Sequence, residues 1–402
     1  MTKIILITLF NLVCLVSYAQ LIRGPYLQAV TPTSIVIRWR TEMKTDSKIQ
    51  LGATPDSKAI IKQENELVND HEIKITGLHP QTRYYYSIGT ATETWQGDVD
   101  NYFETAPEIG RTGKYRFGVF GDCGTHSIIQ DKVKTQFANY LGQDYLNAWL
   151  LLGDNAYSLG TDTEYQMHFF EHYKDNLLKK YAVFPSPGNH DYSNDNFDRQ
   201  NDHNIPYYDN FTMPKEGEAG GLASGTESFY SFDYGNVHFL SLDSYGREDQ
   251  STRLYDTLGR QVQWIKADLA ANTNKDWVVA YWHHPPFSLG TRNGETDPEM
   301  TAIRENFIRI LERMGVDLIM CGHSHVYERT KLMKGFYQKA PAFIASEYQV
   351  SQSTGKYDGS NGSCPYIKTR GSNNGTVYVV CGSSGQIGNV SEGFPHPAMQ
   401  YA

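Results

Sequence analysis

Residues 321–330 read Cys-Gly-His-Ser-His-Val-Tyr-Glu-Arg-Thr and place two histidines, His323 and His325, two positions apart. The apolar residues 316–320 precede them and predict a buried strand that ends in a loop. In an extended loop both imidazoles can face one point, and neutral imidazole is the commonest metal ligand among protein side chains. Because a polar turn can also contain two unrelated histidines, a metal site is predicted only if matching residues occur elsewhere in the chain.

Four other apolar runs end in loops that carry ligand-type side chains. In chain order, they are residues 115–120 before Gly121-Asp122-Cys123-Gly124, residues 148–152 before Gly153-Asp154-Asn155-Ala156-Tyr157, residues 182–184 before Gly188-Asn189-His190-Asp191, and residues 277–282 before His283-His284-Pro285-Pro286. Open α/β sheets place their sites at the carboxyl ends of strands. We therefore expect the five loops to meet.

The side chains in these loops suit a particular kind of metal site. Carboxylate, amide and imidazole groups favour iron, manganese, zinc or similar ions over a thiolate site. A carboxylate shared by two cations holds them roughly 3.5–4 Å apart, the separation used in two-metal hydrolysis. Such a pair activates a bridging water, binds phosphate oxygens and stabilises an in-line displacement. The pattern thus predicts a hydrolytic centre with two ions.

The composition is that of a globular protein. The chain has 402 residues, of which 40% are hydrophobic and 20% charged, which excludes a disordered or fibrous class. The formal net charge is −9 and there is no long basic run, which argues against a surface for nucleic acid.

Residues 1–19 are typical of an export signal. Lys3 supplies the positive start, residues 4–16 the apolar centre, and Ser17-Tyr18-Ala19 a small-residue cleavage site before Gln20. The apolar part is too short to span a bilayer, and no later run reaches the roughly 18 residues that a spanning helix needs. We expect a protein without a membrane span that is exported to the periplasm or secreted.

Four of the five cysteines lie beyond this segment, few for an exported protein, so the fold is expected to depend on its core rather than on disulfides. Cys364 and Cys381 flank a stretch rich in Gly, Ser and Asn and are candidates for a pair. The states of Cys123 and Cys321, each beside a candidate metal loop, stay open at this point.

The pattern of hydrophobic residues divides the mature chain in two. Residues 20–107 contain short alternating runs and turns, as in residues 34–40, which predict a half-buried strand. The spacing of Leu78, Pro80, Thr82 and Tyr84 resembles the tyrosine corner of a fibronectin type III-like sandwich. From residue 114 to 402 strands alternate with amphipathic helices, expected at 130–141, 165–180, 261–271 and 302–314, which predicts a mixed α/β domain. Residues 193–227 show little periodicity and are expected to form a functional rim or lid.

The five blocks together resemble the signature of the metallophosphoesterases, and Tyr157, three residues after Asp154, is similar to the purple acid phosphatase branch. The order of the two domains resembles the larger, plant-type members. The resemblance implies a fibronectin III-like sandwich followed by an α/β metallophosphoesterase domain with two mixed sheets flanked by helices. It also implies an acid phosphatase that hydrolyses phosphomonoesters of small molecules through a metal-bound hydroxide.

The same resemblance implies a set of site residues. A ferric ion would be held by Asp122, Asp154, Tyr157 and His325, and a divalent ion, zinc, manganese or iron, by Asp154 as the bridge, Asn189, His283 and His323. His283 is preferred to His284 because the family pattern is histidine, one residue, then proline. His190 would contact the substrate phosphate or aid proton transfer, and Asp191 would orient an imidazole.

Two segments depart from the plant-type pattern. Residues 287–299 lack the further histidines that those members carry, which leaves leaving-group protonation unassigned and makes Arg292 a candidate contact for an anionic substrate. Residues 376–382 predict a strand and residues 385–402 a loop, where the family adds closing strands. His126, His168, His172 and His203 are expected to be ordinary surface or loop residues, although His203 lies in the rim segment.

Two alternatives to the phosphomonoesterase remain. One is a phosphodiesterase or nucleotide-cleaving enzyme on the same scaffold. The other is an exported binding protein in which the sandwich recognises a surface or carbohydrate partner and the metal site is vestigial. The presence of all seven candidate ligands argues against the second, because a decayed site should have lost some of them.

Overall fold

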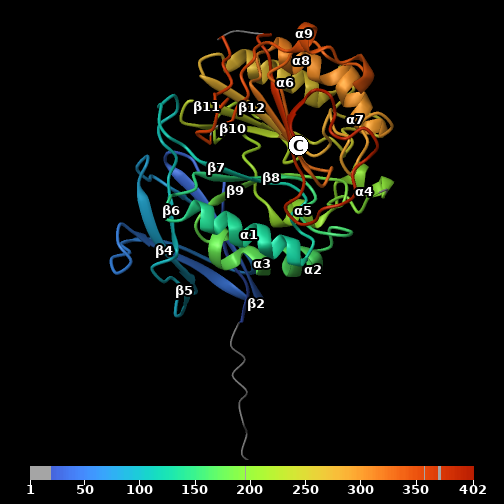
Figure 1. The fold of residues 1–402 in the computed structure, drawn as a ribbon. Coiled ribbons are helices and arrows are strands. Elements are labelled where there is room, and N and C mark those ends of the chain that lie inside the picture. The colour runs from blue at the N-terminus through green and yellow to red at the C-terminus, as the bar shows by residue number, and fades with distance from the viewer. Residues whose placement is uncertain (1–19, 195, 357, 370–372) are drawn as a thin grey trace, which may run out of the picture.

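The computed structural model describes residues 20–194, 196–356, 358–369 and 373–402. The expected export signal therefore lies outside the described residues. Figure 1 shows a β-rich N-terminal part beside a larger α/β part, with two layers of strands lying between two groups of helices. No helix in the described ranges is long and apolar enough to cross a membrane.

The N-terminal part is built around one long strand. It comprises β1 (Leu21–Gln28), β2 (Ser34–Gly52), β3 (Ile60–Thr76), β4 (Arg83–Gly89), β5 (Thr94–Gln96) and β6 (Tyr102–Glu104). Strand β2 pairs antiparallel with β1, β3 and β4. The hydroxyl of Tyr84 accepts a hydrogen bond from the backbone N–H of His79 at 3.0 Å, which is the corner contact that the Leu-Pro-Thr-Tyr spacing predicts.

Strand β2 differs from the prediction of a half-buried strand, because both of its faces are covered between Ser34 and Trp39. The second face of β2 is covered by the α/β part of the chain. The guanidinium of Arg38 donates hydrogen bonds to the backbone oxygen of Asp209 (2.7 Å) and to Thr212 Oγ1 (3.2 Å), so this second face packs against the segment after residue 193.

The first sheet runs through both parts of the chain. Its order is β5-β4-β2-β1-β9-β8-β7, with β3 and β6 paired at its sides, and it includes β7 (Phe117–Phe120), β8 (Ala148–Leu152) and β9 (Ala182–Ser186). Strand β1 joins β9 in parallel through Leu27 and Ala182. The N-terminal strands thus brace the strand that leads into residues 188–191.

The second sheet has the order β10-β11-β12-β13-β15-β14-β16. Its strands are β10 (Tyr230–Tyr234), β11 (Val237–Ser241), β12 (Trp277–Trp282), β13 (Leu318–Cys321), β14 (Tyr327–Thr330), β15 (Val377–Cys381) and β16 (Met399–Tyr401). Alternate residues serve opposite faces: Val279 and Tyr281 join the core shared with the first sheet, whereas Ala280 and Trp282 join the core beneath the helices. This two-sided burial explains why β12 appears as an unbroken apolar run.

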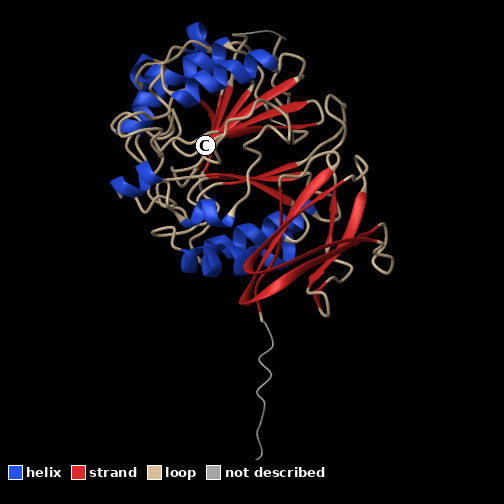
Figure 2. Cartoon of the chain, turned by 180° about the vertical axis from the view of Figure 1, so that it is seen from behind, coloured by secondary structure: helices blue, strands red, loops and turns tan. Residues whose placement is uncertain are grey.

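Helices cover the outer sides of the two sheets, as the reverse view also shows (Figure 2). On the first sheet lie α1 (Ile128–Leu141), α2 (Asp162–Glu164) and α3 (Glu171–Tyr173), and on the second α6 (Arg260–Ala271), α7 (Pro298–Ala302) and α8 (Ile308–Arg313). Shorter elements are α4 (Phe197–Asp202), α5 (Pro206–Asn210), α9 (Ala345–Tyr348) and a 3₁₀ turn at Ala340–Ala342. The predicted helices at 165–180 and 302–314 are present but contain π-helical turns at Tyr165–Phe170, Lys174–Leu178 and Ile303–Phe307.

The rim segment 193–227 contains two short helices, α4 and α5, and its role as a rim or lid stays a prediction. The expectation of a loop over residues 385–402 is wrong: β16 pairs antiparallel with β14, with Tyr401 opposite Arg329, and adds a strand to the second sheet. A three-residue strand is too short to show periodicity, so its hydrogen bonds to β14 were the missing information.

Candidate metal centre

The five predicted loops meet at one place, at the carboxyl ends of β7, β8 and β9 from the first sheet and of β12 and β13 from the second. Ligand atoms of Asp154, His283 and His323 all lie within 4.8 Å of one another, and all three side chains are buried. The convergence expected from the sequence is therefore present for residues that are up to 169 positions apart (323 − 154).

One half of the site contains the residues expected to hold a divalent ion. His283 Nε2 lies 3.1 Å from Asp154 Oδ2, 3.0 Å from Asn189 Oδ1 and 3.2 Å from His323 Nδ1. The other ring nitrogen of His283, Nδ1, lies 2.8 Å from the backbone oxygen of Leu152, an acceptor, and must donate to it. In the neutral ring Nε2 would then present a lone pair to the two oxygens, which is repulsive unless a cation or a proton lies between them.

The other half contains the residues expected to hold a ferric ion. The hydroxyl of Tyr157 lies 2.9 Å from Asp122 Oδ1, 2.9 Å from Asp154 Oδ2 and 3.5 Å from His325 Nε2. His325 Nε2 is 3.3 Å from Asp122 Oδ1. Asp154 belongs to both halves, which is the position that a bridging carboxylate requires.

The loop backbones are held in uncommon conformations to achieve this. Three candidate ligands without the freedom of glycine adopt positive φ: Asp122 at 58°, Asp154 at 54° and His323 at 65°. Such backbone conformations are costly and concentrate at functional sites. At Gly188 a Cβ would lie 2.3 Å from Asp154 Oδ1, so the close approach of this loop to the carboxylate requires glycine.

Asp154 and His283 shift each other's pKa. Burial opposes ionisation of Asp154, but His283 outweighs it and holds the pKa of Asp154 well below its usual range. Burial likewise lowers the pKa of His283, yet the Asp154 carboxylate raises it to about 9. Without an ion, a proton on His283 therefore occupies the place of a cation, and metal binding would displace it.

Tyr157, like His283, carries a proton that a bound cation would displace. Burial, together with the carboxylates of Asp122 and Asp154, raises the pKa of its phenol well above the usual value. The phenol is then a neutral donor to these carboxylates. A trivalent cation would reverse this balance and favour the tyrosinate.

His190 lies beside these ligands. Its Nδ1 is 2.6 Å from the backbone oxygen of Ser158, so Nδ1 carries the proton and Nε2 faces the site, 3.9 Å from Asp154 Oδ2. Its side chain is 17% exposed, so it can meet a substrate.

Asp191 differs from its expected role. Its carboxylate accepts hydrogen bonds from the backbone N–H of Gly188 (2.7 Å), from Asn155 N (3.1 Å) and Nδ2 (3.1 Å), and from the Tyr165 hydroxyl, rather than from an imidazole. It therefore ties the Asn189 loop to the Asp154 loop. Burial and the charge of Asp154 raise the pKa of Asp191 to about 7.

Four further residues lie at the site that were not predicted to take part in it. Asp297 Oδ2 lies 3.5 Å from His323 Nε2, His168 Nδ1 lies 2.8 Å from the backbone oxygen of Tyr157, Gln386 Nε2 lies 3.2 Å from His325 Nε2, and the His284 ring lies 4.2 Å from that of His323. Of these, only His284 had a sequence signal, its place beside His283 and before two prolines. His168, expected to be an ordinary residue, instead supports Tyr157.

The cysteines take no part in the site. All four described cysteines are free, so Cys364 and Cys381 do not pair in this structure. Cys123 and Cys321 are buried, and burial raises the pKa of both thiols. Both therefore behave as small apolar groups in the core.

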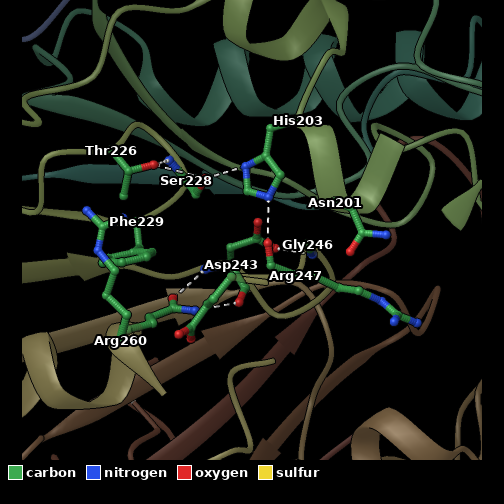
Figure 3. A pocket seen from close by; sticks show the side chains of 11 residues that line it. Asn201, His203, Thr226, Ser228, Phe229, Asp243, Gly246, Arg247 and Arg260 are labelled. Atoms are coloured by element: carbon green, nitrogen blue, oxygen red, sulfur yellow. Dashed lines mark hydrogen bonds between the residues drawn. The ribbon is translucent and has the colours of Figure 1, made fainter. Parts of the chain in front are cut away.

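A separate polar cavity of about 220 Å³ includes His203, Asp243 and Arg247 in its lining. Figure 3 shows the His203 imidazole between Ser228 and the backbone of Arg247, at 2.9 and 2.8 Å, so it contacts none of the candidate ligands. The cavity lining contains no candidate ligand. The prediction that His203 is an ordinary loop residue agrees with this position.

Comparison with known proteins places the chain in a family. Residues 115–327 match the calcineurin-like phosphoesterase family, and residues 24–100 match the purple acid phosphatase N-terminal domain. The chain belongs to the calcineurin-like phosphoesterases, and within them to the purple acid phosphatases. The fold class predicted from the five blocks is confirmed by these matches.

Individual relatives agree with this assignment. The chain is 28% identical over 285 residues to purple acid phosphatase 15 of Arabidopsis thaliana, covering 65% of this chain and 49% of that protein. It is 25% identical over 384 residues to human (Homo sapiens) acid phosphatase type 7, covering 88% and 75%. The chain thus spans about half the length of the first of these relatives. The structure of purple acid phosphatase PPD1 from yellow lupin (Lupinus luteus) seeds superposes with a TM-score of 0.70 at 17% identity, over 94% of this chain and 68% of that one, which shows the shared fold.

Proposed function

We propose that the chain is an acid phosphatase that hydrolyses phosphomonoesters of small molecules at a centre of two metal ions. The observation that carries the proposal is the environment of His283 Nε2. It faces Asp154 Oδ2 and Asn189 Oδ1 at 3.1 and 3.0 Å in a fully buried position, while Nδ1 is committed to a backbone carbonyl. A buried nitrogen among acceptors fits a cation.

The donor set divides into a harder and a softer half. Two carboxylates, a phenol and one imidazole fit a ferric ion: Asp122, Asp154, Tyr157 and His325. The second set consists of the Asp154 carboxylate, the Asn189 amide and the imidazoles of His283 and His323. This set fits a divalent zinc, manganese or iron ion. When bound, such an ion pair supplies activated water and neutralises charge on the phosphoryl group.

The chain itself supplies orientation and a proton path. Leu152 fixes the tautomer of His283, and Ser158 fixes that of His190, through their backbone oxygens. With Nδ1 committed to Ser158, Nε2 of His190 accepts a proton in the neutral ring, and only the doubly protonated imidazolium can donate a hydrogen bond to a phosphate oxygen or pass a proton to the leaving group. Asp191 holds the loop that carries Asn189 and His190 against the Asp154 loop.

Elemental analysis together with a visible spectrum tests the metal assignment. We expect two equivalents of metal, one of them iron, and a visible charge-transfer band from the tyrosinate. Tyr157→Phe should remove this band while the far-ultraviolet circular dichroism stays unchanged. An unchanged band in that variant would mean that Tyr157 is not the iron ligand.

Turnover of p-nitrophenyl phosphate and of bis(p-nitrophenyl) phosphate separates the monoesterase from the diesterase. We expect the monoester to be the better substrate. Preference for the bis ester would favour the phosphodiesterase alternative, and absence of both activities in protein loaded with two ions would favour a binding protein with a vestigial site.

We further propose that the protein is exported, to the periplasm or outside the cell, after cleavage of residues 1–19. The charge, apolar centre and small-residue site of this segment support the proposal. The mass of protein recovered from the extracytoplasmic fraction should match a chain that begins at Gln20; an intact chain retained in the cytoplasm would contradict it.

A further inference from the structure

The side-chain amide of Asn189 has two different ends, and only one of them can bind a cation. Its Oδ1 is an acceptor that can act as a ligand, whereas its Nδ2 carries two protons and cannot. In the structure Oδ1 lies 3.0 Å from His283 Nε2, within the half of the site that fits a divalent ion. Rotation of the amide by half a turn would put the NH₂ group there instead. Binding of an ion therefore requires that the chain favour the first orientation.

Asn194 contacts the other end of this amide. Asn189 Nδ2 donates a hydrogen bond to Asn194 Oδ1 at 2.8 Å, and Asn194 Nδ2 donates to the backbone oxygen of Ser158 at 3.1 Å. Because a backbone carbonyl can only accept, Asn194 must turn its Nδ2 toward Ser158 and its Oδ1 toward Asn189. Asn189 must then direct its Nδ2 to Asn194 and its Oδ1 to His283. The orientation of the ligand thus follows from one carbonyl group, transmitted through Asn194.

The backbone of Asn194 is also held in place. Its N–H donates to the backbone oxygen of Asn189 at 2.7 Å. Its own oxygen accepts hydrogen bonds from the Tyr245 hydroxyl and from Gln200 Nε2, both at 3.2 Å. Its φ is 55°, a left-handed conformation in which asparagine is enriched. The side chain of Asn194 therefore starts from a fixed backbone, which limits the positions that its amide can take.

Asn194 differs from the groups that orient the histidines of the site. The tautomers of His283 and His190 are fixed by the backbone oxygens of Leu152 and Ser158, which no substitution removes. The orientation of Asn189 instead depends on a side chain. This contact can therefore be deleted while the candidate ligands themselves stay unchanged.

We propose that Asn194 is a positioning residue for the divalent half of the metal centre, where it fixes the Asn189 amide with Oδ1 toward His283. The inference rests on the metal phosphatase function proposed above. Loss of such a partner typically weakens metal binding about 10–100-fold. The ligand set that fits the ferric ion contains no amide, so the effect should be confined to the divalent ion.

Asn194→Gly removes the side-chain amide and retains a residue that adopts positive φ readily. We expect the Kd of Zn²⁺, measured by competition with a chelator in protein that has kept its iron, to rise about 10–100-fold. The visible iron band should stay in place. Turnover of p-nitrophenyl phosphate should fall at low Zn²⁺ and recover when Zn²⁺ is saturating, because a bound ion itself selects the Oδ1 orientation. A loss through misfolding would not recover in this way.

A change in the ligand itself separates orientation from general support of the loop. Asn189→Asp replaces the amide by a carboxylate, whose two oxygens are equivalent, so this side chain has no wrong end. Asn194→Gly should therefore weaken Zn²⁺ binding by a much smaller factor in the Asn189→Asp protein than in the wild type. If Asn194 only supported the loop, the two factors would be equal.

Ser193→Gly is the matched control. Ser193 also has a positive φ, 58°, but its hydroxyl donates to the backbone oxygen of Leu159 at 2.7 Å rather than to a candidate ligand. The control should leave the Zn²⁺ affinity, the iron band and the turnover unchanged.

Four results would overturn the inference: an unchanged Zn²⁺ affinity in Asn194→Gly, loss of the iron band in that variant, equal factors in the two backgrounds, or an equal loss in Ser193→Gly. None of them affects the proposed phosphatase function. That function fails separately if wild-type protein with two ions hydrolyses neither ester.

Discussion

Two buried clusters of histidine and carboxylate groups in this molecule look alike in composition but differ in how their hydrogen bonds are completed. In the metal centre, one nitrogen of His283 faces the oxygens of Asp154 and Asn189. In the second cluster, each nitrogen of His238 has its own carboxylate, Asp233 at 2.8 Å and Asp268 at 2.6 Å, and Lys275 pairs with Asp233 at 2.9 Å. The second cluster is satisfied when both nitrogens of His238 carry a proton, one donor for each carboxylate, whereas the first places several acceptors around one nitrogen.

The comparison teaches how to separate a site from a structural network. Burial and residue type are similar in the two clusters, so neither distinguishes them. What distinguishes the two clusters is the number of acceptor atoms that face each nitrogen of the histidine ring. The His238 cluster also connects β11 with α6 and with the backbone N–H of Leu222, which donates to Asp268 at 2.6 Å, and this explains its burial as a brace.

The largest difference between the clusters should appear when each loses one carboxylate. Asp154→Asn removes the carboxylate that belongs to both halves of the metal centre, so we expect loss of metal loading and of hydrolysis with little change in the metal-free fold. Elemental analysis and turnover of p-nitrophenyl phosphate measure this. A variant that retained two equivalents of metal and full turnover would show that Asp154 is not the bridge.

Asp268→Asn makes the matching change in the second cluster and should have the opposite profile. Removing one partner of a buried ion pair costs about 3–5 kcal/mol of stability. Urea unfolding should show this loss, while metal content and turnover of the folded protein stay at the wild-type level. Loss of metal from folded Asp268→Asn protein would mean that the two clusters are coupled rather than separate.

Asp297 gives the metal centre one feature of the second cluster, a carboxylate near an imidazole. It lies 3.5 Å from His323 Nε2, the nitrogen turned away from His283. Loss of such a partner typically weakens metal binding about 10–100-fold. We therefore expect Asp297→Asn to lower affinity for the divalent ion by this factor, measured by competition with a chelator, and to leave the visible iron band in place. Asp297 also caps α7, so Asp297→Ser, which can retain the cap, separates the two roles.

The sequence predicted which candidate ligands come together but not the groups that support them, and the reason is physical. Asp122, Asp154 and His283 follow apolar strands directly, so their positions are set by strand ends that periodicity predicts. Asp297 and Gln386 reach the site from loops whose path depends on tertiary packing. The hydrogen bonds of Asp191 depend on the direction of its side chain, which spacing does not determine.

The secondary structure also divides into elements that the sequence predicted and elements that it did not. Strands β8 and β12 were predicted to the residue, because both are buried on two faces and appear as apolar runs. Strand β14, Tyr327–Thr330, has the sequence Tyr-Glu-Arg-Thr, and its polar composition hides its place between β15 and β16. The parallel contact of β1 with β9 joins the two predicted domains into one sheet, a long-range pairing that local patterns do not encode.

The smallest expected effect concerns the pH dependence of the second cluster. Burial lowers the pKa of His238, but its two carboxylates outweigh burial and raise the pKa above its usual value of 6.5. A group whose pKa is raised on folding stabilises the fold fully below its unfolded pKa and ceases to do so as the pH rises through the folded value. The free energy of unfolding of wild type relative to His238→Gln should therefore be largest below about pH 6.5 and decrease steadily above it. Parallel urea titrations between pH 6 and 9 measure this difference; a difference that grew with pH would mean that His238 is neutral in the folded protein, and the contrast with His283 would then lose its basis.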